Sequence, residues 1–324
     1  MPSERTPILR RATEGHWLAW MGHPIRYLAT GSETNGRYAM SWGTVPVGKG
    51  PPPHRHEFEE GFYVIEGEVT FTAGNQSVVL TSGDFINIGG GTAHTLENTG
   101  DIEARLIVVV GPAGFDQFQF DGGSPISGPE DIDDTTPQTS IDHLTQIGPN
   151  FGIDLAPPPE AFEVEPSITV RKSGEGTHIA VVGDLYRFLA VGEETNDTYA
   201  LWEATVFPGG GPPPHVHSRE EEGFFLLEGE LTFSVGDEQI VAGPGSFANM
   251  PVGVKHAFKN EGTVPAKMLI LLAPSGLEKM FLQTGKVLTS ADDDVPPPNS
   301  EEIQRLLKIA PEYGIEIRVP KGQH

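Results

Sequence analysis

Cysteine is absent from the 324-residue chain. This absence excludes a disulfide framework, a thiolate-bound metal and a cysteine nucleophile. Basic residues are scarce, with 21 Lys and Arg against 45 Asp and Glu and a formal charge of -24. Such a chain repels phosphates, so we expect no nucleic-acid partner. Its apolar runs fall short of the roughly 18 consecutive residues that a membrane-spanning helix needs, so we expect no membrane partner either.

The N-terminal segment lacks the apolar core of a secretory signal peptide. Residues 1–20 mix Arg, Glu and His instead. Together with the missing cysteine, this composition predicts a cytoplasmic protein. The sequence leaves the oligomeric state open, with a homodimer among the options.

Glycine and proline are abundant by contrast, with 40 and 29 residues and no collagen-like period. Their frequency is typical of many short strands joined by turns. The chain is longer than one ordinary domain of about 100–200 residues, so we expect two domains.

The sequence repeats itself once, which turns this expectation into a definite division. Four pairs of segments match: 33–35 with 194–196, 51–56 with 212–217, 61–68 with 223–230, and 151–154 with 313–316. The offset is 161 residues up to the second His of each copy and 162 after it, so the second copy carries one extra residue near 218–221. A repeat of this length is a domain rather than a solenoid unit. We therefore predict an N-terminal domain over 1–155 and a C-terminal domain over 156–324.

Within each copy the pattern favours an all-β fold. Short runs rich in β-branched and aromatic residues alternate with turn residues such as Gly, Asn, Asp and Ser. In the first copy these runs lie at 62–65, 68–71, 77–80 and 106–110. Their even spacing predicts a sandwich or a jelly-roll barrel. Segments 139–147 and 300–309 have apolar residues at helical spacing, and we expect them to form peripheral helices.

Four potential metal donors recur in each copy at nearly the same spacing. They are His54, His56, Glu60 and His94, and then His215, His217, Glu222 and His256. In a strand, His54 and His56 project from one face while Arg55 points the other way. Three imidazoles and one carboxylate suit Fe, Mn, Co, Ni, Cu or Zn and leave room for water, dioxygen or substrate.

The alternative is that these residues are ordinary strand surface, which a lone His-x-His pair would not exclude. The recurrence of all four donors favours the metal sites. Neighbouring acids at Glu59, Glu220 and Glu221 look like solvated charges. The remaining histidines have no such partners and are interpreted as surface or linker residues: His16, His23, His143, His178 and His324.

At these donors the sequence resembles the cupin superfamily. Its first motif, a His-x-His pair and a Glu between two glycines, is matched by Gly48, His54, His56, Glu60 and Gly67 and by Gly209, His215, His217, Glu222 and Gly229. Its second motif is matched by Gly83, Gly91, His94 and Asn98 and by Gly245, Pro251, Gly253, His256 and Asn260. Gly89 stands where the first copy should have the proline of this motif. The resemblance implies two tandem jelly-roll barrels, a bicupin, with one divalent transition metal (Fe, Mn, Ni, Co or Cu) in each.

Flanking segments are similar to the quercetin 2,3-dioxygenase group, notably Pro-Pro-His-x-His and the strand that ends in Glu-Gly-Glu. That resemblance implies cleavage of a flavonol, a small aromatic substrate, by dioxygen with release of carbon monoxide. It makes the eight donors metal ligands and gives Glu60 and Glu222 a second role as base for the flavonol 3-hydroxyl. Substrate-pocket candidates are Tyr38, Phe62, Tyr199 and Phe224, whose alternative role is barrel core.

Other activities remain open at this point. A manganese oxalate decarboxylase or oxidase needs a cation beside its dianionic substrate. Arg55 is directed away from the metal, and neither Arg37 nor Arg105 has support from spacing. A dioxygenase for another phenol or diketone, or a non-catalytic cupin that binds a small molecule, are further alternatives, because the fold alone does not determine function.

Overall fold

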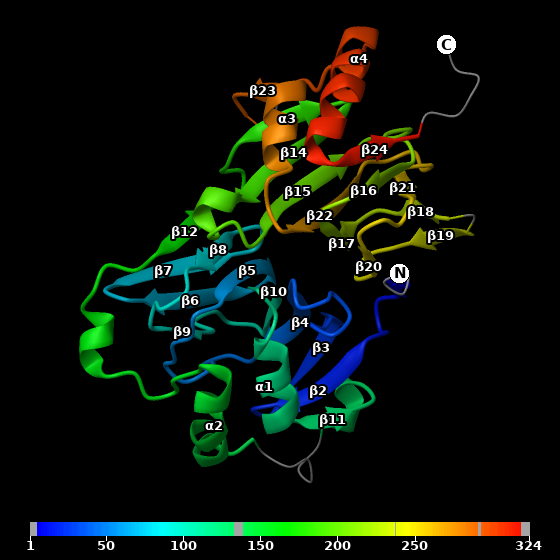
Figure 1. The fold of residues 1–324 in the computed structure, drawn as a ribbon. Helices are drawn as coiled ribbons and strands as arrows, with labels where there is room; N and C mark the ends of the chain where they lie inside the picture. Colours follow the sequence, from blue (N-terminus) through cyan, green and yellow to red (C-terminus); the bar gives the residue numbers. More distant parts are fainter. Residues whose placement is uncertain (1–4, 133–138, 237, 291–292, 319–324) are drawn as a thin grey trace. The chain divides into compact units, whose positions relative to one another are not determined.

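The computed structural model describes residues 5–132, 139–236, 238–290 and 293–318. Contacts divide the chain into two compact units. The N-terminal unit consists of 14–173 and 194–198, and the C-terminal unit of the first 13 residues, 174–193 and the chain from 199 onward. Each is predominantly β, as the sequence predicts (Figure 1). Within the described residues no helix is both long and apolar enough to cross a membrane.

The N-terminal unit holds two antiparallel sheets, one of eight strands in the order β11-β2-β3-β4-β10-β5-β8-β12 and one in the order β7-β6-β9. The strands are β2 (His16–Trp20), β3 (His23–Ala29), β4 (Ala39–Val45), β5 (Glu59–Glu66), β6 (Glu68–Ala73), β7 (Gln76–Thr81), β8 (Phe85–Ile88), β9 (His94–Glu97), β10 (Ala104–Gly111), β11 (Ser124–Ile126) and β12 (Ile168–Arg171). Strand β6 buries Val69, Phe71 and Ala73 and leaves the residues between them half-buried, which is the period of two expected of a barrel wall. Phe71 packs on Phe62 of β5 with ring centroids 4.9 Å apart, so the two sheets share one core.

The C-terminal unit repeats this arrangement with an eight-stranded sheet, β1-β20-β17-β22-β15-β14-β13-β23, and a five-stranded one, β19-β18-β21-β16-β24. The strands are β1 (Ile8–Arg10), β13 (His178–Val181), β14 (Asp184–Ala190), β15 (Ala200–Val206), β16 (His215–His217), β17 (Glu221–Glu228), β18 (Leu231–Val235), β19 (Glu238–Ala242), β20 (Phe247–Met250), β21 (His256–Lys259), β22 (Ala266–Ala273), β23 (Lys286–Leu288) and β24 (Ile315–Ile317). Phe224, Phe233 and Phe258 pack together inside this barrel.

In the described part of the chain, four α-helices flank the barrels: α1 (Phe115–Gly122), α2 (Ile141–Ile147), α3 (Glu278–Thr284) and α4 (Ser300–Ile309). The sequence predicts α2 and α4, and both begin at a capping side chain. Ser140 accepts a hydrogen bond from the backbone N–H of His143, and Asn299 accepts one from that of Glu302. Short 3-10 turns occur at η1 (Pro129–Asp131), η2 (Gly148–Phe151), η3 (Pro159–Phe162), η4 (Gly192–Glu194) and η5 (Ala310–Tyr313).

Each unit is completed by a strand from outside its own repeat copy. Strand β1 lies in the first copy but pairs with β20 in the C-terminal unit, and β12 lies in the second copy but pairs with β8 in the N-terminal unit. Gly89, the departure from the cupin motif, donates its backbone N–H to the carbonyl of Ser167, 2.7 Å away, next to β12. Proline has no N–H and could not make this bond. The predicted domain limits, 1–155 and 156–324, remain a proposal.

Candidate metal centres

The N-terminal cluster is built where three strand segments meet. His54 pairs with His94 through two backbone hydrogen bonds of 2.8 and 2.9 Å, which sets both rings beside each other at the start of β9. Glu60 lies on β5, and its Oε2 is 2.9 Å from Nε2 of His56 and 3.1 Å from Nε2 of His94. All four donors are buried, and their ligand atoms lie within 4.8 Å of one another.

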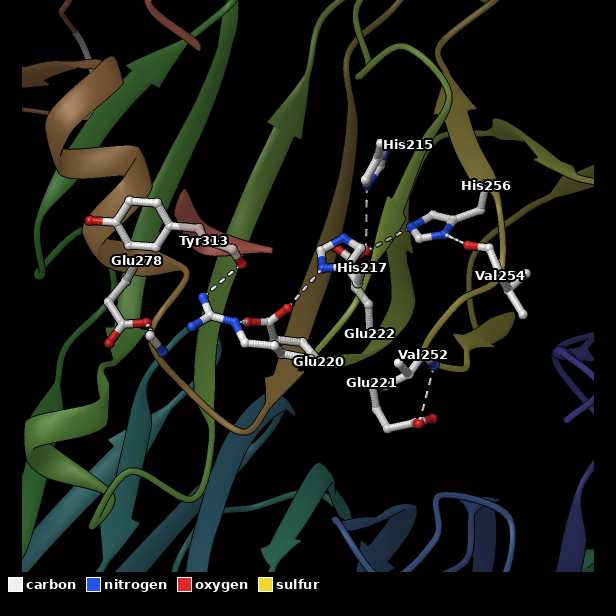
Figure 2. Close-up of polar contacts among 12 residues, drawn as sticks. His215, His217, Glu220, Glu221, Glu222, Val252, Val254, His256, Glu278 and Tyr313 are labelled. Atoms are coloured by element: carbon white, nitrogen blue, oxygen red, sulfur yellow. Dashed lines mark hydrogen bonds and ion pairs between the residues drawn. The ribbon is translucent and has the colours of Figure 1, made fainter. Parts of the chain in front are cut away.

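The C-terminal cluster has the same construction (Figure 2). His215 and His217 lie on β16, Glu222 on β17 and His256 on β21, and all four are buried. Oε2 of Glu222 is 2.8 Å from Nε2 of His256, 2.9 Å from Nε2 of His217 and 3.8 Å from Nε2 of His215. The structure thus brings together the donors that the sequence singles out in each copy.

Backbone carbonyls fix the orientation of four of the six rings. In each case Nδ1 lies 2.8–3.0 Å from the carbonyl oxygen two residues earlier, as the four ring–carbonyl pairs show: His54 with Pro52, His94 with Thr92, His215 with Pro213 and His256 with Val254. Because a carbonyl only accepts, Nδ1 must carry the proton, and the Nε2 lone pair of the neutral ring faces the cluster.

This tautomer tests whether a metal fits. The Nε2 lone pair of neutral His94 and the Oε2 of Glu60 are both acceptors, yet they lie 3.1 Å apart in a buried site. Two acceptors at that distance require a proton or a cation between them. The same holds for His256 and Glu222 at 2.8 Å. Three nitrogens and one carboxylate in this arrangement are the donor set of a divalent transition metal, so the residues of both clusters fit such an ion.

The electrostatics favour the ligand forms of His54, His215 and Glu60 but not of His217, whose pKa Glu222 and Glu220 raise to about 9 against the opposing effect of burial. Burial lowers the pKa of His54 to about 3 and that of His215 to about 4, so both rings are neutral at pH 7. Burial alone would raise the pKa of Glu60, but its polar contacts with His56 and His94 outweigh this effect and hold that pKa well below its usual range. His54, His215 and Glu60 therefore need no costly deprotonation before they bind a metal.

The acids next to the clusters correct one expectation. Glu59, Glu220 and Glu221 are not solvated: their relative exposures are 3%, 1% and 0%. Glu59 accepts hydrogen bonds from Asn87 at 2.8 Å and Asn196 at 2.7 Å. The sequence interpretation was wrong because both faces of these strand ends are covered by segments that are remote in sequence.

Glu221 and His178 show the same effect in the C-terminal unit. Glu221 is paired with Arg5 and accepts a hydrogen bond from Asn249 at 3.2 Å. His178, interpreted as a surface residue, is buried at the start of β13.

A cavity of about 140 Å³ adjoins the N-terminal cluster. His54, Glu60 and His94 form part of its wall, and the rest is mostly apolar, with Phe62 from β5 and Phe115 and Phe118 from α1. Its polar side includes Tyr27, whose hydroxyl donates to Oε1 of Gln119. Burial raises the pKa of Tyr27 well above its usual range, with Asp116 and Glu60 adding to the shift, so the phenol stays neutral.

The C-terminal cavity is smaller, about 90 Å³, and carries an additional acid. His215, His217 and Glu222 line it together with Trp202, and Asp184 lies on the same wall. Asp184 is 2% exposed and accepts backbone hydrogen bonds from Phe207 at 3.0 Å and Gly211 at 2.8 Å. Burial raises its pKa to about 6, although these bonds oppose the shift.

Of the four substrate-pocket candidates, only Phe62 is on a cavity wall among the described residues. Tyr38, Tyr199 and Phe224 are at most 1% exposed, are absent from the walls of both cavities and belong to the buried interior. Sequence reasoning missed α1, which supplies Phe115 and Gln119, and it missed Asp184. Helix α1 follows Gly114, which offers no side-chain cap, so its start carries no clear sequence signal.

The Cupin domain family matches residues 41–110 and again 202–272. The quercetin 2,3-dioxygenase of Bacillus subtilis (strain 168) is 24% identical over 300 residues, which cover 88% of each protein. A Lactobacillus farciminis oxalate decarboxylase in complex with formate has a TM-score of 0.58 at 15% identity and covers 86% of this chain and 91% of that one.

A Bacillus subtilis oxalate decarboxylase studied for its Mn(II) centres has a TM-score of 0.55 at 17% identity and covers 85% of this chain and 79% of that one. At such identities the two structures support the fold and not the activity. With the two matched domains and two buried His/Glu metal-binding clusters, one per domain, the chain is a bicupin of the cupin superfamily.

Proposed function

We propose that the protein is a metal-dependent dioxygenase that cleaves a flavonol such as quercetin with dioxygen and releases carbon monoxide, and that the N-terminal centre performs the reaction. The observation that carries the proposal is the N-terminal cavity: it is largely apolar, reaches three of the four metal donors, and has no Lys or Arg among the described residues of its wall. A flat aromatic substrate matches such a wall. The similarity to a quercetin 2,3-dioxygenase over most of both chains supports the same assignment.

The same observation disfavours oxalate. A small dianion needs a cation at the site. None of the three arginines considered for that role, Arg37, Arg55 and Arg105, lies on the described wall of the N-terminal cavity, and two of them are paired elsewhere. Arg55 pairs with Asp154 at 3.0 Å and Arg105 with Glu66 at 2.9 Å, and all four side chains are about 40% exposed or more. The C-terminal cavity disfavours an anion as well, because Asp184 adds a carboxylate to its wall.

In the proposed mechanism, Glu60 accepts the proton of the substrate's 3-hydroxyl. A bound divalent metal supplies Lewis acidity, which lowers the pKa of that hydroxyl, and electronic contact with dioxygen. Glu60 is suited to its role because it is ionised, buried and on the cavity wall. His54, His56 and His94 complete the donor set that holds the metal.

The remaining wall residues orient the substrate and exclude water. Phe62 and Phe115 provide flat apolar contacts for the rings. Because the hydroxyl of Tyr27 is donated to Oε1 of Gln119, the amide nitrogen of Gln119 is left to donate to a substrate oxygen. Tyr27 thereby acts as a positioning residue for Gln119. An apolar wall also protects the electron-rich substrate anion from bulk water.

The test is an oxygen-consumption assay. Protein loaded in turn with Mn, Fe, Co, Ni and Cu is mixed with quercetin in air, while the flavonol absorbance and dissolved oxygen are followed. We expect a stoichiometric loss of both, which Glu60→Gln abolishes and Glu222→Gln retains. Metal content is measured in each variant, so that loss of the metal is distinguished from loss of the base. No consumption with any of the five metals would contradict the flavonol assignment, and equal loss in both variants would contradict the choice of centre.

A further inference from the structure

We propose that Glu220 is a positioning residue of the C-terminal metal centre, which holds the ring of His217 in place and makes this centre bind its metal more tightly than the N-terminal one. The inference concerns metal binding and is independent of which substrate the protein takes.

Glu220 reaches the back of a ligand. Its Oε2 lies 3.4 Å from Nδ1 of His217, on the side of the ring away from Glu222 (Figure 2). Nε2 of the same ring faces the cluster, 2.9 Å from Glu222. Glu220 is 1% exposed, so water does not compete for the contact. A carboxylate behind a ligating histidine fixes the tautomer and the ring orientation and raises the basicity of the ligand.

Further contacts fix Glu220 itself. Its other oxygen, Oε1, lies 3.5 Å from Nε of Arg219, and Arg219 donates to the carbonyl of Tyr313 at 2.6 Å. The backbone N–H of Ser218 donates to the carbonyl of Gly314 at 2.9 Å. Strand β24 then pairs with the ligand strand β16, with His217 opposite Ile315. The carboxylate is therefore anchored to the same C-terminal segment that supports the ligand.

Among the described residues, the N-terminal centre has no counterpart of this contact. The residue before each ligand glutamate is equivalent in the two copies, because Glu59 and Glu221 both bind an asparagine, Asn87 and Asn249 respectively. The extra residue of the second copy thus lies before this point and places Glu220 behind His217. In the first copy Nδ1 of His56 is buried and has no hydrogen-bond partner among the described residues. The inserted residue of the second copy therefore accounts for the difference between His217, which Glu220 supports, and His56, which lacks such a contact.

Loss of such a supporting group commonly costs about 10–100-fold in metal affinity. The experiment measures Mn(II) binding, from the EPR signal of the free ion at fixed pH, in two single-centre proteins. Glu60→Ala leaves the C-terminal centre and Glu222→Ala leaves the N-terminal one. We expect the lower Kd in the protein that keeps the C-terminal centre.

Variants of Glu220 are then made in that protein. Glu220→Ala should raise the Mn(II) Kd by roughly 10–100-fold and change the EPR signature of the bound ion. Glu220→Gln keeps an acceptor oxygen at the same reach and should restore part of the affinity, since positioning needs the acceptor more than the charge. Glu278→Ala is the matched control, because Glu278 is another buried acid of this unit, remote from the metal donors, that accepts hydrogen bonds from the backbone N–H groups of Gly192 and Gly276.

Circular dichroism establishes that each variant is folded before binding is measured, and Glu220→Gln keeps the test valid if Glu220→Ala does not fold. An unchanged Kd in the folded Glu220 variants would overturn the proposal. So would equal Kd values in the two single-centre proteins, or a loss in Glu278→Ala as large as in Glu220→Ala.

Discussion

Replacing Asp184 with Asn should remove a pH-dependent destabilisation of the C-terminal unit. The carboxylate is 2% exposed and is held by the backbone N–H groups of Phe207 and Gly211. Burial raises its pKa to about 6 from the ordinary 3.8. The native state therefore holds this proton more tightly than the unfolded chain does.

The sign and size follow from that difference. Because the folded-state pKa is the higher one, stability is greatest below about pH 4, falls as the pH rises through 6, and then levels off. A difference of about two pKa units corresponds to roughly 3 kcal/mol at neutral pH. The variant also loses one of two acceptors for backbone N–H groups, but that cost does not vary with pH.

The assay is native-state hydrogen exchange of the metal-free protein between about pH 4 and pH 7, read in peptides from β15 and β22. Wild type and Asp184→Asn are compared at each pH, so that intrinsic exchange rates and the titration of other groups cancel. Peptides from β4 and β10 of the N-terminal unit serve as an internal control and should show no difference. A stability difference between the two proteins that stays constant across this range would refute the reasoning.

Three further outcomes are expected. Gly314→Ala should lower the free energy of unfolding, measured in urea, by more than Gly152→Ala does. Both glycines have a left-handed backbone, which costs about 1–2 kcal/mol in the alanine variant, but only at Gly314 (φ +77) would a Cβ also meet the inserted loop, at 2.4 Å from Oγ of Ser218. Equal losses in the two variants would contradict this. After a chelator removes the metal, the melting temperature should fall as the pH drops below 6.5. The reason is that His54, whose pKa in the folded protein is lowered to about 3, takes up a proton when the chain unfolds. A metal-free protein that is equally stable at acid pH would contradict this. Deleting residues 1–12 removes β1 and the cationic partner of buried Glu221, and should destabilise the C-terminal unit by on the order of 2 kcal/mol or more without affecting exchange in the N-terminal unit.

The fold and the metal clusters were predictable because their signals are local and duplicated. A His-x-His pair on a strand places both rings on one face whatever surrounds it, and the second copy confirms the pattern. Helices α2 and α4 were predictable because Ser140 and Asn299 cap them.

What sequence reasoning missed depends on remote segments. The burial of Glu220 is set by the C-terminal strand β24 and its preceding turn, about ninety residues downstream, so no local pattern distinguishes it from a solvated acid. The role of Gln119 depends on the short helix α1, which lacks a capping side chain. Tyr38 and Phe62 cannot be distinguished as aromatic residues in the sequence. Only the packing of the sheets shows that Tyr38 belongs to the core and Phe62 to the cavity wall.

The exchanged strands have a consequence for synthesis on the ribosome. The edge of β8 finds its partner only after residues 168–171 have been made, beyond the end of the first repeat copy. Strand β1 is translated more than 230 residues before its partner β20. Strand β1 must therefore stay unpaired while these residues are made, and neither repeat copy, cut out at the repeat boundary, would encode all the strands of one barrel. We expect the duplicated gene to tolerate a break at this boundary poorly, even though the sequence repeat makes it look like the natural place to divide the protein.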